Sequence, residues 1–280
     1  MRSFICTVCA FVALAFPSAL AQFMIESRQM VSNGQKTVTY TINTAQLTLG
    51  FLQGHPYSAD EITQQTNTLA DGTHMVRTSQ PNFLCRDFVG RTRTEKRPPL
   101  LPKENQIEMP ALVEILDPVS GFGYYLDTVN RVAHRLVLRQ PIKFLPARQA
   151  LYPNPLPPIS SKPSTADERI TTSERLGTKI LEGVSVEGQR ITWTYPIGSV
   201  GNDRPIVTTK EIWQSRELNT TILSTSYDPR SGESIHALIN ISLAEPDPSL
   251  FQIPPGYKVV DETGSFTITI TSASPKSPVK

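Results

Sequence analysis

Cysteine is scarce in this chain of 280 residues. Two of its three cysteines, Cys6 and Cys9, belong to a leader segment that we expect to be removed, which leaves Cys85 as the only thiol of the mature protein. A chain with one cysteine forms no intramolecular disulfide, so burial of apolar surface must stabilise the fold. Cys85 lies in an apolar, strand-like run at 83–88, which predicts a packed, unreactive thiol rather than a nucleophile or a link between two copies.

Signatures of catalysis and of metal binding are also missing. No His-Glu-x-x-His or Cys-x-x-Cys spacing occurs in the sequence, so we expect no metal site and no cofactor. Residues 183–187 lack the second glycine of a nucleophile elbow, and Gly121-Phe122-Gly123 lacks the third glycine of a dinucleotide-binding loop. These absences favour a protein that is not an enzyme. A hydrolase with two spatially assembled acids is the less favoured alternative.

The histidines occur singly, at His55, His74, His134 and His236. His134 shares a predicted strand face with Val132 and Leu136, which is typical of a hydrogen-bonded core histidine. His236 lies on the polar face of its strand, where we expect it to be solvated.

Long runs of one charge are absent as well. The chain has 27 lysines and arginines against 25 acidic residues, a net charge of +2, and the two signs are interspersed. This balance excludes a strongly basic surface, so no nucleic-acid partner is expected. The densest basic cluster is interleaved with Asp87 and Glu95, which predicts ion pairs on a solvated face; a site for an anionic head group is the alternative. Its cations are Arg86, Arg91, Arg93, Lys96 and Arg97.

The N-terminal residues have the features of a secretory signal peptide. Arg2 precedes an apolar run at 4–16, Pro17 ends it, and Ala19-Leu20-Ala21 fits the small-x-small cleavage pattern. A retained membrane anchor is the alternative, but this run is shorter than the roughly 20 residues that span a bilayer. We therefore predict a signal peptide at 1–21 and an exported protein, periplasmic or extracellular, with no transmembrane span after cleavage.

Alternating polar and apolar residues predict strands in the N-terminal portion. Val38, Tyr40 and Ile42 alternate with threonines, the pattern of a half-buried strand. Asp71-Gly72 predicts a hairpin turn, with a helix capped at 58–61 as the alternative. Further short strands follow, separated by turns about every 8–12 residues, and no helix-period stripe occurs. The sequence therefore predicts a mainly β fold, antiparallel, with few short helices.

Proline divides the chain. Seven of the 24 prolines lie between 141 and 163, and proline disfavours both helix and strand pairing. An ordinary connector is the preferred interpretation of residues 141–167, and a proline-rich docking segment for a partner is the alternative. The predicted divisions are an N-terminal β portion at 22–140, a proline-rich linker or loop at 141–172, a C-terminal β portion of the same sheet at 173–271, and a disordered tail at 272–280.

The C-terminal portion has the most regular alternation. Ile191, Trp193 and Tyr195 are predicted to share one strand face, with polar residues between them on the other. The run at 235–243 alternates over its whole length, and a slip of one residue would expose its apolar set, so its register should be well specified. The apolar set of this run is Ile235, Ala237, Ile239, Ile241 and Leu243.

The order of turns and strand ends in this portion resembles the LolA-like superfamily, whose members include periplasmic lipoprotein carriers and the lipid-binding sensor RseB. Uncharacterised secreted bacterial proteins with Asp71-Gly72, Arg86-Asp87 and Gly90-Arg91-Thr92-Arg93 are also similar. The resemblance covers roughly 56–257. It is carried by Glu182-Gly183-Val184, Gly188-Gln189-Arg190, Glu211-Ile212-Trp213, Asp228-Pro229-Arg230, Gly232-Glu233, Leu250-Phe251-Gln252-Ile253-Pro254 and Gly256-Tyr257.

The resemblance implies a strongly curved antiparallel sheet, a half-barrel, with an apolar cavity for acyl chains. The proline-rich insert has no counterpart in that family, and the sequence shows no covering helices. We therefore expect an exported, non-enzymatic protein that binds a hydrophobic ligand, a lipid or a lipoprotein acyl chain, in the concavity of a sheet. Trp193, Tyr195 and Trp213 are the predicted ligand-binding residues. An envelope structural or sensor module that acts through protein partners is the alternative.

Overall fold

The computed structural model describes residues 24–32, 35–43, 50–51, 53–98, 110–138, 143–144 and 169–271. Strands dominate these ranges, and the one helix within them is the short 3-10 helix η1 (Pro248–Phe251). The predicted mainly β class with a curved sheet is therefore confirmed. The predicted signal peptide and tail lie outside the described residues. Most of the proline-rich segment also lies outside them; the described parts are residues 143–144 and those from 169 onward. Residues 143–144 form β11 (Lys143–Phe144), which pairs in parallel with β3 (Gly50–Phe51).

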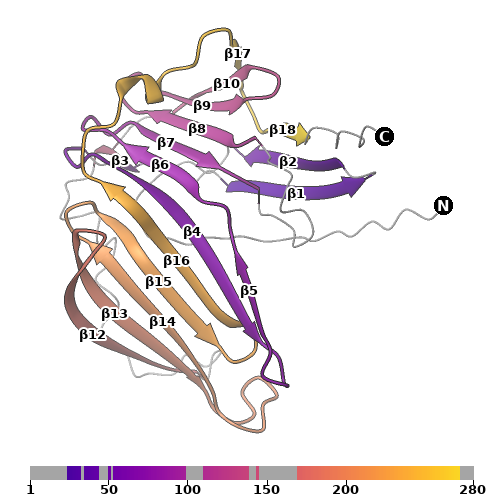
Figure 1. Cartoon of the computed structure of the whole chain (residues 1–280), viewed down its shortest axis with the longest axis vertical. Coiled ribbons are helices and arrows are strands. Elements are labelled where there is room, and N and C mark those ends of the chain that lie inside the picture. The colour runs from indigo at the N-terminus through magenta and orange to yellow at the C-terminus, as the bar shows by residue number, and fades with distance from the viewer. Residues whose placement is uncertain are drawn as a thin grey trace, which may run out of the picture.

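Thirteen strands form one large sheet (Figure 1), in which all neighbours are antiparallel except β10 and β17. Twelve of them follow one another across the sheet, and β5 (His74–Thr78) pairs with β4 beside this path. The order is β12 (Ile170–Leu181), β13 (Val184–Tyr195), β14 (Ile206–Ser215), β15 (Thr220–Asp228), β16 (Gly232–Ser242), β4 (Tyr57–Thr68), β6 (Asn82–Arg86), β7 (Thr92–Lys96), β8 (Leu112–Asp117), β9 (Phe122–Asp127), β10 (Val132–Val137) and β17 (Lys258–Asp261).

The sheet has two halves that differ in strand length. Strands β6 to β10 are five or six residues long and form, with β17, the short-strand half. Strands β12 to β16 and β4 are nine to twelve residues long and form, with β5, the long-strand half. Strand β4 joins the halves, because residues 57–61 pair with β6 while 64–68 pair with β5. The predicted hairpin at Asp71-Gly72 connects β4 to β5, and no helix replaces it.

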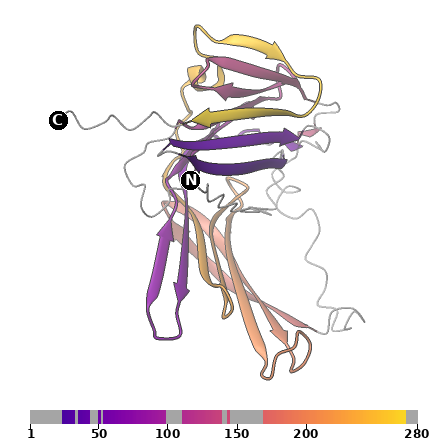
Figure 2. The same cartoon turned by 90° about the vertical axis from the view of Figure 1, so that its right-hand side faces the viewer.

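A second sheet covers one face of the short-strand half. It consists of β1 (Met24–Ser32), β2 (Gln35–Asn43) and β18 (Phe266–Thr271), which lie side by side in Figure 2. Val38, Tyr40 and Ile42 are buried, as their alternation predicts. They join a core with residues of β8, β9, β10 and β18 and the residue after β10, namely Leu112, Leu116, Tyr125, Leu136, Leu138, Ile268 and Ile270.

His134 helps to hold the second sheet in place. Its Nδ1 lies 2.7 Å from Glu262 Oε1, and its ring stacks on Phe266 at 4.9 Å between centroids. The prediction of a hydrogen-bonded, packed histidine is therefore confirmed.

The opposite face of the short-strand half is covered by η1 and the chain around it. Phe251 of η1 is buried against Cys85 and four other buried residues, Val113, Ile115, Leu126 and Ala133. Burial raises the pKa of the Cys85 thiol to about 12, so the thiol stays protonated at neutral pH. The predicted packed thiol is confirmed, and the short-strand half is covered on both faces.

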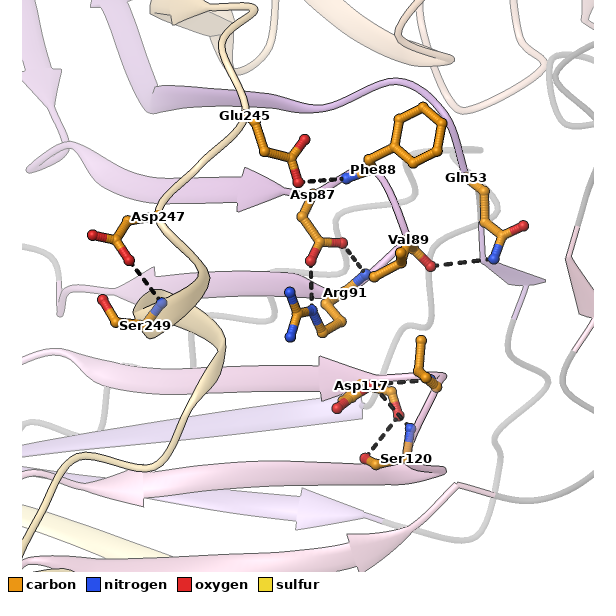
Figure 3. A network of polar contacts seen from close by, with 11 residues as sticks. Gln53, Asp87, Phe88, Val89, Arg91, Asp117, Ser120, Glu245, Asp247 and Ser249 are labelled. Atoms are coloured by element: carbon orange, nitrogen blue, oxygen red, sulfur yellow. Dashed lines mark hydrogen bonds and ion pairs between the residues drawn. The ribbon is translucent and has the colours of Figure 1, made fainter.

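Hydrogen bonds to carboxylates fix the turns at the edge where β6 and β8 end (Figure 3). The Asp87 carboxylate accepts from the backbone N–H and from Nε of Arg91. Glu245 Oε1 accepts from the backbone N–H of Phe88 at 3.1 Å, which ties the chain after β16 to the β6–β7 turn. Asp117 accepts from two backbone N–H groups of the β8–β9 turn in the same way. These contacts close turns whose backbone donors would otherwise lack partners.

Arg86 sits where the two halves meet and is only 2% exposed. Its guanidinium donates to the carbonyl oxygen of His55 from Nε and Nη2, and to the carbonyl oxygen of Leu218 from Nη2 at 2.8 Å. It also lies 4.9 Å from the centroid of the Tyr57 ring. One side chain of β6 therefore joins the start of β4 to the loop between β14 and β15.

The alternation predicted for residues 235–243 is wrong beyond Ile239. The pairing of β16 with β4 shifts between Ile239 and Ser242, and Asn240 adopts a positive φ of 55°. This bulge inserts one residue, so Ile241 packs in the core cluster near Ala59 instead of continuing the row that begins at Ile235.

Replacing Arg86 by methionine should destabilise the fold by about 3 kcal/mol, because it removes charge-assisted hydrogen bonds and leaves buried carbonyl groups unpaired. Urea unfolding monitored by circular dichroism measures this change. Arg97→Met is the matched control, since Arg97 is exposed. Equal unfolding midpoints for R86M and R97M would show that Arg86 does not hold the halves together.

Cys85 should react slowly in the folded protein, because the thiolate is the reactive form and is scarce at pH 8 for a buried thiol with a pKa of about 12. Brief labelling with iodoacetamide, followed by mass spectrometry of the peptide that contains Cys85, measures the rate. We expect labelling at least about tenfold slower than in concentrated urea. Equal rates in both conditions would contradict the buried position.

Candidate functional site

The long-strand half differs from the rest of the molecule because it forms a single layer. In the part of the chain that the structure describes, the extensive contacts of β12 to β16 are all with neighbours in the sheet (Figures 1 and 2). A sheet in a globular protein usually buries at least one face against a second layer. The faces of this half are therefore the candidate functional surfaces.

Strand register assigns the side chains of this half to two faces, because directly paired residues point the same way. Trp193 pairs with Thr208, Ile191 with Lys210, and Lys210 in turn with Ser226. We call this side the Trp193 face. It carries Ile191, Trp193, Tyr195, Ile206, Thr208, Lys210, Ile212, Ser224, Ser226, Ser234, His236, Thr63 and Gln65.

The Trp193 face is divided into an apolar strip and a polar strip. The apolar strip lies on β13 and β14 and consists of Ile191, Trp193, Tyr195, Ile206 and Ile212. The polar strip lies on β15, β16 and β4. It consists of Ser224, Ser226, Asp228, Ser234, His236, Glu61, Thr63 and Gln65.

Away from the Arg86 end of this half, side chains on the Trp193 face are less exposed than those on the opposite face. Thr208 and Ser224 are 8% and 5% exposed, whereas Val207 and Tyr227, which point the other way, are 43% and 50% exposed. Such a difference distinguishes the inner from the outer side of a curved sheet, because side chains crowd together on the inner side. The Trp193 face is therefore the inner side.

The opposite face is charged and polar on β12 to β14, away from Trp213, and largely apolar on β15, β16 and β4, where it carries Leu223, Ile235, Ala237 and Ile62. Arg190 lies between two carboxylates on neighbouring strands, with Nη1 3.2 Å from Glu174 and Nη2 2.6 Å from Glu211. Threonines flank this row on β12, β13 and β14. Cross-strand ion pairs of this kind are ordinary on an exposed sheet face and leave its charges compensated.

The structure brings together two of the three predicted ligand-binding residues. Trp193 and Tyr195 share the inner face, and the Arg230 guanidinium lies 5.2 Å from the Tyr195 ring centroid. Trp213 lies on the opposite face at the end of the half nearest Arg86, where it is buried against Gly188 and beneath the Lys179 ammonium, 3.6 Å from its ring. Trp213 is therefore part of the core and is separated from the other two.

Lys210 is a charged residue of the Trp193 face that the sequence did not identify as a candidate site residue. It is half-buried and makes no ion pair with any residue that the structure describes. Its charge nevertheless acts on the polar strip. Burial lowers the pKa of His236, and the positive charge of Lys210 contributes to this lowering. The sequence alone could place Lys210 on the same strand face as Ile206 and Ile212, because these residues are separated by even numbers of positions. Its cross-strand neighbours follow only from the register.

His236 is half-buried rather than solvated, and its Nδ1 lies 3.0 Å from Thr63 Oγ1. Three cations of the predicted basic cluster form ion pairs, Arg91 with Asp87, Arg93 with Glu95 and Lys96 with Glu114. The prediction of a solvated face is wrong for Arg86 and Asp87, which are buried.

The described residues show no cluster that could bind a metal ion, because no group of three or more His, Cys, Asp or Glu side chains among them is placed to hold one. Glu114 accepts a hydrogen bond from the buried Tyr125 hydroxyl, while Asp117 and Asp127 close the turns that follow them. Likewise, no helix in the described ranges is long and apolar enough to cross a membrane.

No protein-family model matches this chain, and no curated protein matches its sequence. Among solved structures, an uncharacterized conserved protein from Thermus thermophilus is similar at 8% identity and a TM-score of 0.34, over 75% of this chain and 91% of the other. PNGF-II is similar at 9% identity and a TM-score of 0.31, over 74% of this chain but only 32% of PNGF-II. A LolA superfamily protein from Nitrosomonas europaea is similar at 9% identity and a TM-score of 0.26, over 71% and 90% of the two chains. The structural neighbours thus include a LolA superfamily protein, which is a similarity of fold alone.

Replacing Gly188 by alanine should destabilise the core at the Arg86 end of the long-strand half. An added Cβ would stand 2.5 Å from the Trp213 ring, so the ring or the strand would have to move, at a cost of about 2 kcal/mol. Thermal unfolding checks this effect, with Ser185→Ala, at an exposed position of the same strand, as control. Unchanged stability of G188A would show that Trp213 is not packed on β13 as described.

Proposed function

We propose that this chain is an exported, non-enzymatic binding protein that holds the apolar chain of a lipid or lipoprotein on the Trp193 face. The observation that carries the proposal is a single-layer sheet whose inner side bears a continuous apolar strip. An apolar ligand would supply the second layer that the described part of the chain does not. Export rests on the predicted signal peptide at 1–21.

The energy of such binding comes from removing apolar surface from water. A ligand chain that buries about twelve methylenes gains ~10 kcal/mol. Part of this gain offsets the translational and rotational freedom that the ligand loses. We therefore expect micromolar rather than subnanomolar affinity, which suits a protein that must also release its ligand.

Trp193 should report directly on binding. Titration with oleate should shift the tryptophan emission to the blue, because the ligand chain displaces water from the indole ring. Trp193→Phe should abolish this shift, since Trp213 is buried on the other face and senses no ligand. Trp193→Ala should weaken binding of a fluorescent fatty-acid probe about tenfold.

Thr192→Ala is the matched control, because Thr192 belongs to the same strand but points to the opposite face. Equal loss of affinity in T192A and W193A would place the ligand elsewhere. Absence of probe binding to the wild-type protein, together with no lipid in an organic extract of the purified protein, would refute the proposal.

A further inference from the structure

Lys210 occupies the boundary between the two strips of the Trp193 face. Its direct cross-strand neighbours are Ile191 of the apolar strip and Ser226 of the polar strip, and Thr208 and Ile212 flank it along β14. An ammonium group at this position is adjacent to hydrocarbon on one side and to hydroxyl groups on the other.

Lys210 makes no ion pair among the described residues, in contrast to the arginines near it. Arg190 on the opposite face has two carboxylate partners, and Arg230 at the end of the Trp193 face is paired with Asp228 at 2.7 Å. The acids of this face do not pair with Lys210. Asp228 is held by Arg230, Glu187 is paired with Arg216 at 2.6 Å, and Glu61 lies on β4, three strands from β14 and about 14 Å along the sheet. Within the described part of the chain, Lys210 is thus a half-buried cation that forms no ion pair, and its diagonal neighbour Asp228 is already bound by Arg230.

A cation in this setting favours an anionic partner. Partial burial weakens its hydration, so an oxyanion brought to it would gain more than at the exposed rim of the sheet. The hydroxyl groups of the polar strip can donate to the same oxygens, with Ser226 paired directly to Lys210 and Ser224 next to it on the same face of β15.

We propose that Lys210 binds the oxyanion head group, carboxylate or phosphate, of a single-chain amphiphile whose apolar chain lies along Ile191, Trp193 and Tyr195. This inference rests on the proposed function and names the class of its ligand. The polar strip then surrounds the head group, and the strip on β13 and β14 covers the chain. The amphipathic division of the face matches the amphipathic division of such a ligand.

Three oleoyl probes test the inference on the purified full chain: oleate, its neutral methyl ester, and oleoyl lysophosphatidate. We expect the wild-type protein to bind oleate at least about tenfold more tightly than methyl oleate, by displacement of a fluorescent probe below the aggregation concentration of each lipid. Tighter binding of lysophosphatidate than of oleate would identify a phosphate head group, and the reverse order a fatty acid.

Variants assign the preference to Lys210. Lys210→Gln should lower the affinity for oleate about tenfold and leave that for methyl oleate unchanged, which also shows that the variant is folded. Lys210→Arg should keep the preference, and so should Lys258→Gln, which removes an exposed lysine from the short-strand half. Equal affinity of the wild type for oleate and methyl oleate, or a K210Q variant that keeps the preference, would overturn this inference while leaving the proposed function intact. Failure of the wild type to bind any of the three would overturn both.

Discussion

The architecture depends on one buried cation. The Arg86 guanidinium is held by two backbone carbonyl groups and the face of Tyr57. These contacts reach chain segments that are far apart in sequence, the start of β4 and the loop before β15. An arginine can do this where a lysine cannot, because its planar fork donates in several directions at once. The sheet can therefore continue from short to long strands without a break in its core.

On either side of that junction the two halves of the sheet differ in what covers them. The short-strand half is covered by the second sheet on one face and by η1 on the other, so side chains on both of its faces pack in hydrophobic cores. The long-strand half continues the same hydrogen-bonded ladder as a single layer. Its strands are held mainly by backbone pairing and by the core around Trp213, which leaves the inner side available to a ligand. The enclosed half thus positions a face that no second layer covers among the described residues.

Local alternation was sufficient to predict the strands and part of the candidate site. Ile191, Trp193 and Tyr195 belong to one strand, so a period of two places them together without further information. Trp213 belongs to the next strand, and its side depends on which residue of β13 it faces. It faces Gly188, the residue whose missing side chain makes room for the indole ring. The bulge at Asn240 was invisible for a similar reason, since it follows from the pairing of β16 with β4 rather than from composition.

Charged residues on the two faces of β14 differ in whether they form ion pairs, and this difference favours a bound ligand over an empty surface. Neighbouring residues of β14, Glu211 and Lys210, point to opposite sides. On the outer side the half-buried Glu211 completes a row of ion pairs with Arg190 and Glu174. On the inner side the half-buried Lys210 has no ion-pair partner among the described residues, although partial burial makes an unpaired charge costly. A sheet that served stability alone would pair both charges, so the inner cation is best explained by an anion that arrives with the ligand.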